Sequence, residues 1–155
     1  MIPVTSFFRD TKSFAHLCET VFPQIIKNKK DGDPIRLWVA GCSTGQEVYS
    51  IAICIKEFLS SANYPGDSRG GPVQLFATDI SEPAITKARS GIFTKNEVEE
   101  LSAKRLNDFF TKTNGTYQIN KSVGDMCVFA VHNFLKDPPF GKIDFLSCRN
   151  VLIYM

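Results

Sequence analysis

The sequence lacks the features that identify several common classes of protein. Its five cysteines include no CxxC pair, which argues against a disulfide framework or a zinc site and favours reduced core thiols. No stretch approaches the roughly 20 apolar residues of a membrane span, and no signal-peptide pattern opens the chain. We therefore expect a soluble, cytoplasmic protein with no direct membrane insertion. A net charge of only +2 gives no reason to expect a nucleic-acid partner.

What the sequence does contain is a strand, loop and helix unit over residues 35–50, IRLWVAGCSTGQEVYS. The apolar run is typical of a strand covered on both faces. Gly41 and Gly45 bracket a polar loop that can turn sharply against a ligand. From Gln46 onward the apolar spacing predicts a helix with one apolar stripe. Such a unit is where open α/β sheets bind nucleotides, although a tight turn alone would give the same GxxxG spacing.

Two acidic residues accompany this unit. Glu47, in the first helical turn, would repel a phosphate and attract an ammonium or hydroxyl group, and GCSTG is not the GxGxxG of dinucleotide folds. A second strand, 73–78, ends in Asp79, which is placed to accept hydrogen bonds from a ribose, with capping of the next helix as the alternative. Ser81, with Pro83, should start that helix, and Gly91 should end it.

The rest of the chain divides into short elements. Apolar spacing predicts a helical segment near Phe14 that Pro23 resets. Residues 93–120 are typical of an insertion, with two short helical pieces and a hairpin turn at Asn114-Gly115. Strands at 127–131 and 143–147 complete an α/β sheet, and the segments that follow them meet the glycine loop and Asp79 at one edge. His132 is isolated and is interpreted as structural, so we expect no metal site.

Several segments, in order and at sensible spacing, resemble one family: the CheR-type chemotaxis receptor methyltransferases, which are S-adenosylmethionine-dependent protein-glutamate O-methyltransferases. These segments are VTSFFRD, GCSTGQEVYSIA, FATDIS, ITKARSGIF, CVFAVHNFLKDPPF and DFLSCRNVLIYM. The resemblance implies a Rossmann-like class I methyltransferase sheet with flanking helices over residues 1–155, with a small β insertion at 107–124. It also implies S-adenosylmethionine as the cofactor and S-adenosylhomocysteine as its product.

The resemblance assigns roles to particular residues. The implied cofactor-binding residues are Thr5, Arg9, Gly41, Glu47, Asp79, Asn133, Phe134, Asn150 and Val151. Within this set the loop that ends at Glu47 holds the amino-acid moiety, and Asp79 takes the ribose hydroxyls. The two asparagines, each with the residue after it, line the adenine and sulfur side. Arg9 and Tyr154 are the implied catalytic residues, with Tyr154 directed toward the methyl group. Arg9 could orient the acceptor carboxylate or the cofactor's own, and the sequence does not decide which.

The implied function is methylation of glutamates on the cytoplasmic helical bundle of methyl-accepting chemoreceptors. A glutamate is already ionised at neutral pH, so the reaction needs no general base, and the sequence offers no convincing one. The segments around DPPF and CRNVLIY are closest to versions fused to a CheB-like methylesterase, which adds such an esterase as a partner. The alternative is a non-catalytic docking module that keeps the fold. A nucleic-acid methyltransferase is disfavoured, because the charge is modest and DPPF precedes the wrong strand.

The resemblance also indicates how much of the enzyme this sequence covers. Members of the family continue with several more strands and helices, whereas this sequence stops within the helix that CRNVLIY begins. We therefore expect a C-terminally truncated piece of the enzyme. The strand at 143–147 would then have an open apolar edge, and open edges promote strand exchange and aggregation. On this basis we expect the chain alone to be poorly stable or oligomeric.

Overall fold

A computed structural model of the chain describes residues 7–8, 11–27, 33–61, 73–132 and 143–148. Its central feature is a parallel four-stranded sheet in the order β6-β2-β1-β7. The strands are β1 (Ile35–Ala40), β2 (Val73–Asp79), β6 (Cys127–Val131) and β7 (Phe145–Ser147). The chain moves outward from β1 to β2 and β6, and then returns to place β7 on the other side of β1. This is the predicted Rossmann-like α/β architecture, and its direction of winding reverses between β1 and β7.

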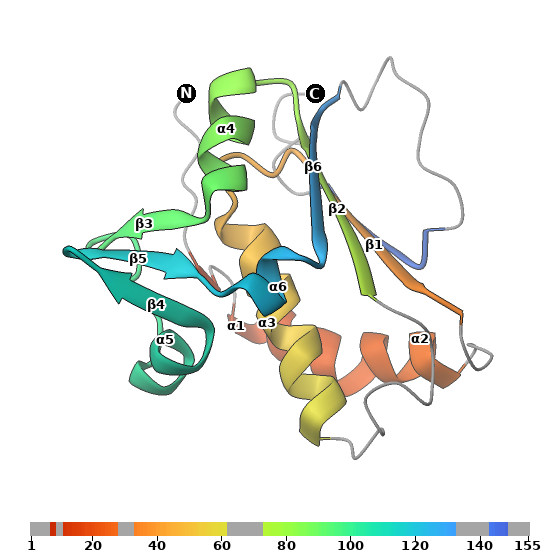
Figure 1. The fold of residues 1–155 in the computed structure, drawn as a ribbon. Helices are drawn as coiled ribbons and strands as arrows, with labels where there is room; N and C mark the ends of the chain where they lie inside the picture. Colours follow the sequence, from red (N-terminus) through yellow and green to blue (C-terminus); the bar gives the residue numbers. More distant parts are fainter. Residues whose placement is uncertain (1–6, 9–10, 28–32, 62–72, 133–142, 149–155) are drawn as a thin grey trace.

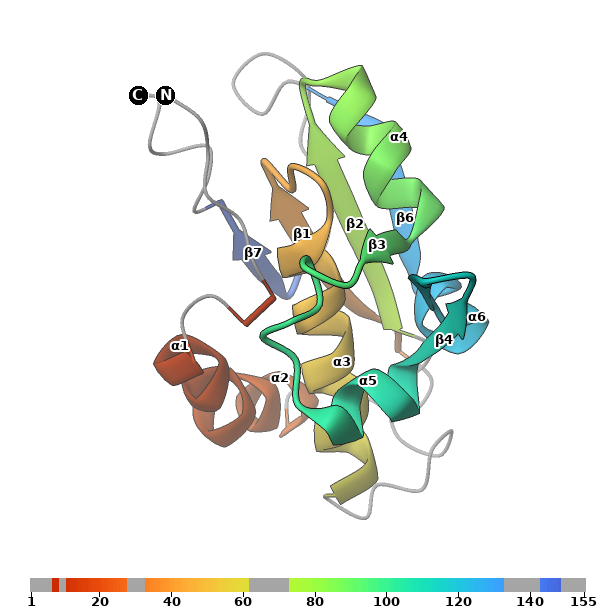
Figure 2. The same ribbon diagram turned by 90° about the vertical axis from the view of Figure 1, so that its left-hand side faces the viewer.

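The helices gather on one face of this sheet (Figure 1; Figure 2). They include α1 (Thr11–His16), α2 (Phe22–Lys27), α3 (Gln46–Ser61) and α4 (Glu82–Ser90). The opposite face carries a row of apolar side chains in register across the strands: Val128, Phe76, Trp38 and Leu146. No helix of the described residues covers this row, and Val128 and Leu146 are 51% and 41% exposed. None of the described helices has the length and apolar character needed to cross a membrane.

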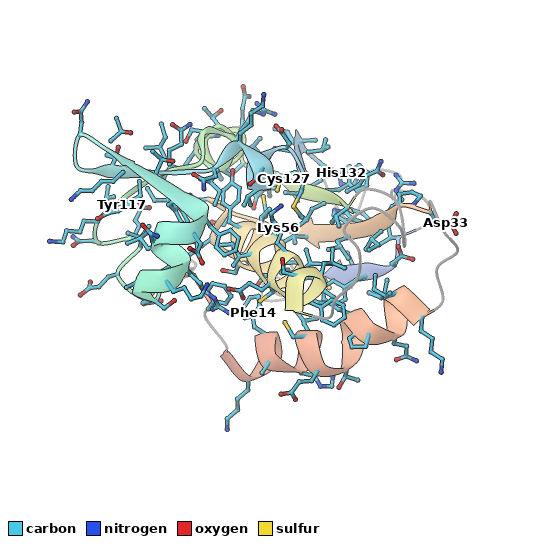
Figure 3. The ribbon with its side chains drawn as sticks, turned by 60° about the horizontal axis from the view of Figure 1, so that its bottom comes forward. Phe14, Asp33, Lys56, Tyr117, Cys127 and His132 are labelled. Atoms are coloured by element: carbon cyan, nitrogen blue, oxygen red, sulfur yellow. The ribbon has the colours of Figure 1, made fainter. Side chains whose placement is uncertain are left out.

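Helix α3 is more deeply buried than its apolar stripe predicts. The predicted stripe is buried at Val48, Ile51, Ala52 and Ile55. The helix also buries Tyr49, Ser50, Ile53 and Cys54, so its first half is enclosed on nearly all sides. The cause is that α3 lies between the N-terminal helical segment and the rest of the molecule, and Phe14 of α1 points toward it (Figure 3). The apolar spacing in the sequence predicts only one buried face of a helix, whereas two sides of α3 are covered by separate elements.

The N-terminal helical segment is reset near Pro23, as the sequence predicts, by a widened turn. A π-helical turn, Leu17–Val21, joins α1 to α2, and the Phe22 N–H donates to the Leu17 carbonyl. Proline lacks an N–H and its ring clashes with the carbonyl four residues earlier. A wider turn just before Pro23 relieves that conflict, so the helix continues in a shifted register instead of ending.

A second, antiparallel sheet in the order β3-β5-β4 lies beside the main one. Its elements are β3 (Ile92–Thr94), α5 (Ala103–Phe109), β4 (Phe110–Thr113) and β5 (Thr116–Ile119), followed by α6 (Lys121–Gly124). The hairpin turn at Asn114-Gly115 is confirmed, and both residues have positive φ, as a type I′ turn requires.

Three details of this region differ from the sequence prediction. Residues 95–100 form turns and not the first of two helical pieces, Phe110 begins a strand, and β3 was not expected. Aromatic packing explains the difference, because the ring of Phe7 meets those of Phe93 and Phe110 edge-on at 5.0 and 5.7 Å. The strands form where they bring these rings together, and helical spacing in the sequence does not report that contact.

Candidate functional site

The polar loop after β1 is held firmly against its surroundings. The Cys42 N–H donates to the Thr78 carbonyl at 2.8 Å, which ties the loop to the end of β2. Gly45 has φ 101°, and a side-chain carbon there would lie 3.0 Å from the Cβ of Ala88 in α4. Only glycine satisfies both the backbone conformation and the close approach. Gly41 stands at the start of this loop, where the resemblance places a cofactor contact.

Asp79 connects the loop to the next helix. One carboxylate oxygen accepts the Ser43 N–H at 2.8 Å, and the other accepts the Ser81 N–H at 2.9 Å. The helix cap is Ser81, whose hydroxyl accepts the Ala84 N–H, and α4 ends at Gly91 in the left-handed conformation, as predicted. The alternative that Asp79 itself caps α4 is therefore wrong. A carboxylate has about four acceptor positions, so these two bonds leave it able to accept from a ribose.

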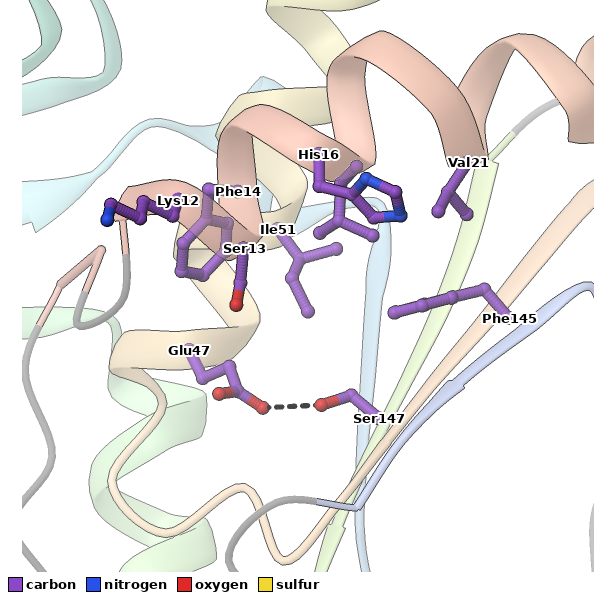
Figure 4. Close-up of a pocket in the computed structure, with 10 residues that line it drawn as sticks. Lys12, Ser13, Phe14, His16, Val21, Glu47, Ile51, Phe145 and Ser147 are labelled. Carbon is purple, nitrogen blue, oxygen red and sulfur yellow. Dashed lines mark hydrogen bonds between the residues drawn. The ribbon is translucent and has the colours of Figure 1, made fainter.

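Glu47 lies in the first turn of α3 and reaches across to β7. Its Oε2 accepts a hydrogen bond from the Ser147 hydroxyl at 2.8 Å, and the two residues are only 8% and 7% exposed (Figure 4). Sequence reasoning did not single out Ser147. The signal that could have found it is the one that found Asp79, namely a polar residue at the end of an otherwise apolar parallel strand.

A pocket of about 390 Å³ opens beside this pair (Figure 4). Glu47 and Ser147 line one end of it, and Ile51, Phe145 and residues of the N-terminal helical segment form its largely apolar remainder. The lining includes neither Gly41 nor Asp79. Of the three described residues to which the resemblance gives a cofactor contact, Glu47 is the one that lines this pocket.

The chemistry of this edge suits a ligand with an ammonium group and hydroxyls. Burial and the nearby Asp79 charge raise the pKa of the Cys42 thiol, so it stays protonated at neutral pH and is a poor nucleophile. The first turn of α3 carries the carboxylate of Glu47, which would repel a phosphate at this position. The ring of His132 packs edge-on against that of Trp38 at 5.5 Å, and the backbone N–H of His132 donates to the Asp79 carbonyl, which are structural contacts of the kind the sequence predicts.

The structure brings together Gly41, Glu47 and Asp79 at the carboxyl ends of β1 and β2. The other predicted site residues lie outside the described residues. They are Thr5, Arg9, Asn133, Phe134, Asn150, Val151 and Tyr154. Their roles therefore stay predictions.

The parallel sheet with its reversal next to β1 and the glycine-bracketed loop define a Rossmann-like α/β domain, with Glu47 and Asp79 at the edge where such domains bind ligands. A family model described as CheR methyltransferase, SAM binding domain, matches residues 3–155, and the chain belongs to this family. The expected cofactor, S-adenosylmethionine, is confirmed by this match, and the carboxylates Glu47 and Asp79 fit its ammonium and ribose groups.

The chain is also similar to curated proteins, and two of the following three are named as chemotaxis protein methyltransferases. The chain is 40% identical over 99% of its length to an uncharacterized 104.1 kDa protein of Rhodobacter capsulatus, of which it covers 16%. It is 38% identical over 97% of its length to chemotaxis protein methyltransferase 1 of Pseudomonas aeruginosa, covering 54% of that protein. A chemotaxis protein methyltransferase of Borreliella burgdorferi is 32% identical, again over 97% of this chain and 53% of the relative. The chain thus spans about half the length of these two methyltransferases.

Proposed function

We propose that this domain serves the transfer of a methyl group to glutamate side chains on the cytoplasmic helical bundle of chemoreceptors. The observation that carries the proposal is the pair of carboxylates at one sheet edge, Glu47 and Asp79, beside a loop without a phosphate fingerprint. That donor set suits an amino acid joined to a nucleoside. Membership of the family and the chemotaxis names of the relatives support the choice of substrate.

The reaction makes limited demands on the protein. S-adenosylmethionine supplies a methyl group on a positively charged sulfur. A glutamate oxygen forms a bond to the methyl carbon as the sulfur–carbon bond breaks, the electron pair goes to sulfur, and no proton moves, because the acceptor is already ionised. In this proposal Glu47 binds the ammonium group and Asp79 the ribose hydroxyls. The protein then contributes orientation, which is worth about 7–11 kcal/mol in well-aligned systems.

The remaining roles are proposed by similarity. Thr5 and Arg9 would approach the methionine end of the cofactor and the acceptor, and Tyr154 would point toward the methyl group. Asn133 with Phe134, and Asn150 with Val151, would line the adenine and sulfur side. A CheB-like methylesterase, which would remove the ester, is the second proposed partner.

The test is to incubate the chain with S-adenosylmethionine carrying a tritiated methyl group and a cytoplasmic receptor fragment. Glutamyl methyl esters release labelled methanol in mild alkali, whereas methyl groups on nitrogen do not. We expect alkali-labile label on the receptor. Glu47→Gln should reduce the labelling about tenfold or more, because it removes the charge that pairs with the ammonium group. Glu99→Gln, at an exposed residue, should leave it unchanged.

Two outcomes would contradict the proposal. Label that resists alkali would mean a different acceptor group. Cofactor and receptor binding without any label would favour the docking module that the sequence leaves as the alternative.

A further inference from the structure

Ser147 and Glu47 are 100 residues apart in sequence and meet across the point where the sheet changes direction. Glu47 begins the helix that follows β1, whereas Ser147 ends β7, the strand on the other side of β1. This crevice between oppositely running connections is where open α/β sheets bind their ligands. A buried side-chain hydrogen bond therefore spans the ligand crevice itself.

Strand alternation accounts for the direction of the Ser147 hydroxyl. Ser147 pairs with Val39 of β1, which faces the helices and is fully buried. Its neighbour Leu146 pairs with Trp38 and points to the opposite, partly exposed face. Because successive side chains point to opposite faces, the register of β7 on β1 sends the hydroxyl toward the first turn of α3.

A glutamate side chain has three rotatable bonds, and a buried carboxylate is costly without a donor. The Ser147 hydroxyl supplies a donor to Oε2 and so selects one orientation of the group. Unlike a lysine or arginine, a hydroxyl does this without neutralising the charge. The carboxylate thus keeps its negative charge while its position is fixed.

We propose that Ser147 is a positioning residue that orients Glu47 to bind the ammonium group of the cofactor. The inference rests on the proposed role of Glu47 and deepens it, because it names the contact that sets the affinity of this domain for the amino-acid part of its ligand.

The test measures two ligands by calorimetry against the whole chain. S-adenosylhomocysteine carries the amino-acid moiety, and 5′-methylthioadenosine has the same adenine, ribose and sulfur without it. Ser147→Ala should weaken S-adenosylhomocysteine binding about tenfold to a hundredfold, the range expected for a hydrogen bond to a charged group. Binding of 5′-methylthioadenosine should change less than about twofold.

Two further variants complete the design. Ser147→Thr keeps the hydroxyl at a residue that lines a pocket of about 390 Å³, and it should restore most of the S-adenosylhomocysteine affinity. Ser122→Ala, at an exposed serine, is the matched control and should bind both ligands as the wild type does.

The outcomes separate this inference from the proposed function. An equal loss for both ligands would mean that Ser147 only supports the fold, and an unchanged affinity for S-adenosylhomocysteine would mean that it does not position Glu47. Either result overturns the inference alone. A wild-type chain that binds neither ligand would overturn the proposed function and this inference with it.

Discussion

Asp79 holds the glycine loop in place before any ligand binds. Its two oxygens accept backbone N–H groups from Ser43 and Ser81, and Ser43 has a positive φ of 52°, unusual for a residue other than glycine. Asp79→Asn replaces one acceptor oxygen with an NH₂ group that faces a donor. We expect the free energy of unfolding to fall by about 1–3 kcal/mol without ligand, and S-adenosylhomocysteine to bind more weakly.

Urea denaturation of the ligand-free protein checks this prediction. Asp108→Asn is the matched control, because Asp108 makes a surface ion pair with Lys104, and its loss should change stability by no more than about 0.5 kcal/mol. A variant at Asp79 that lost affinity with unchanged stability would show that the carboxylate acts on the ligand alone.

At the scale of elements, Arg105 of α5 attaches the small sheet to the core. Its guanidinium makes paired hydrogen bonds to Glu57 of α3 at 2.8 and 3.0 Å and lies 3.9 Å above the ring of Phe8. Lysine cannot form the paired bonds, and its ammonium has no flat face to stack on a ring as the guanidinium does. Arg105→Lys should therefore destabilise the fold by about 1 kcal/mol and Arg105→Ala by about 1–2 kcal/mol.

The neighbouring residue provides the control for this prediction. Lys104 belongs to the same helix, carries the same charge and pairs with Asp108 in solvent. Urea denaturation of Lys104→Ala should match the wild type. Equal effects at the two positions would show that only the surface charge matters and that the stacking on Phe8 contributes nothing.

At the scale of the whole molecule, the buried thiols should make the free energy of unfolding fall as pH rises above neutral. All five cysteines are free, and burial raises the pKa of Cys42 and Cys54 well above the ordinary value for a thiol. Above about pH 8.5 the unfolded chain releases thiol protons that the native state keeps. The contribution of these thiols to the free energy of unfolding is therefore fully present at neutral pH. As pH rises, the free energy of unfolding falls by up to about 1.4 kcal/mol per pH unit for each thiol.

Urea denaturation under reducing conditions between pH 7.5 and 9.5 measures this slope. Cys54→Ala should lower the slope, whatever it does to the stability at neutral pH. A free energy of unfolding that stays level up to pH 9.5 would contradict the burial of these thiols in solution.

Much of the main sheet could be predicted from local patterns. The apolar run of β1, the change to helical spacing at Gln46, and the Ser81 and Gly91 helix ends each depend on a few neighbouring residues. The turn at Asn114-Gly115 does so as well. The small sheet was predicted less well. The position of β3 depends on aromatic rings from Phe7 and Phe110, which lie far from it in sequence.

The sequence by itself determined the fold class, the glycine loop, and the placement of Glu47 and Asp79 at element ends, because strand period, helix period and turn chemistry are local properties. Only the tertiary structure decided that Asp79 clamps the loop, that α3 is enclosed by separate elements, and that Ser147 meets Glu47. These contacts depend on strand order and register. Both are set by which buried surfaces pack together over long sequence distances, and no short stretch of residues encodes that packing.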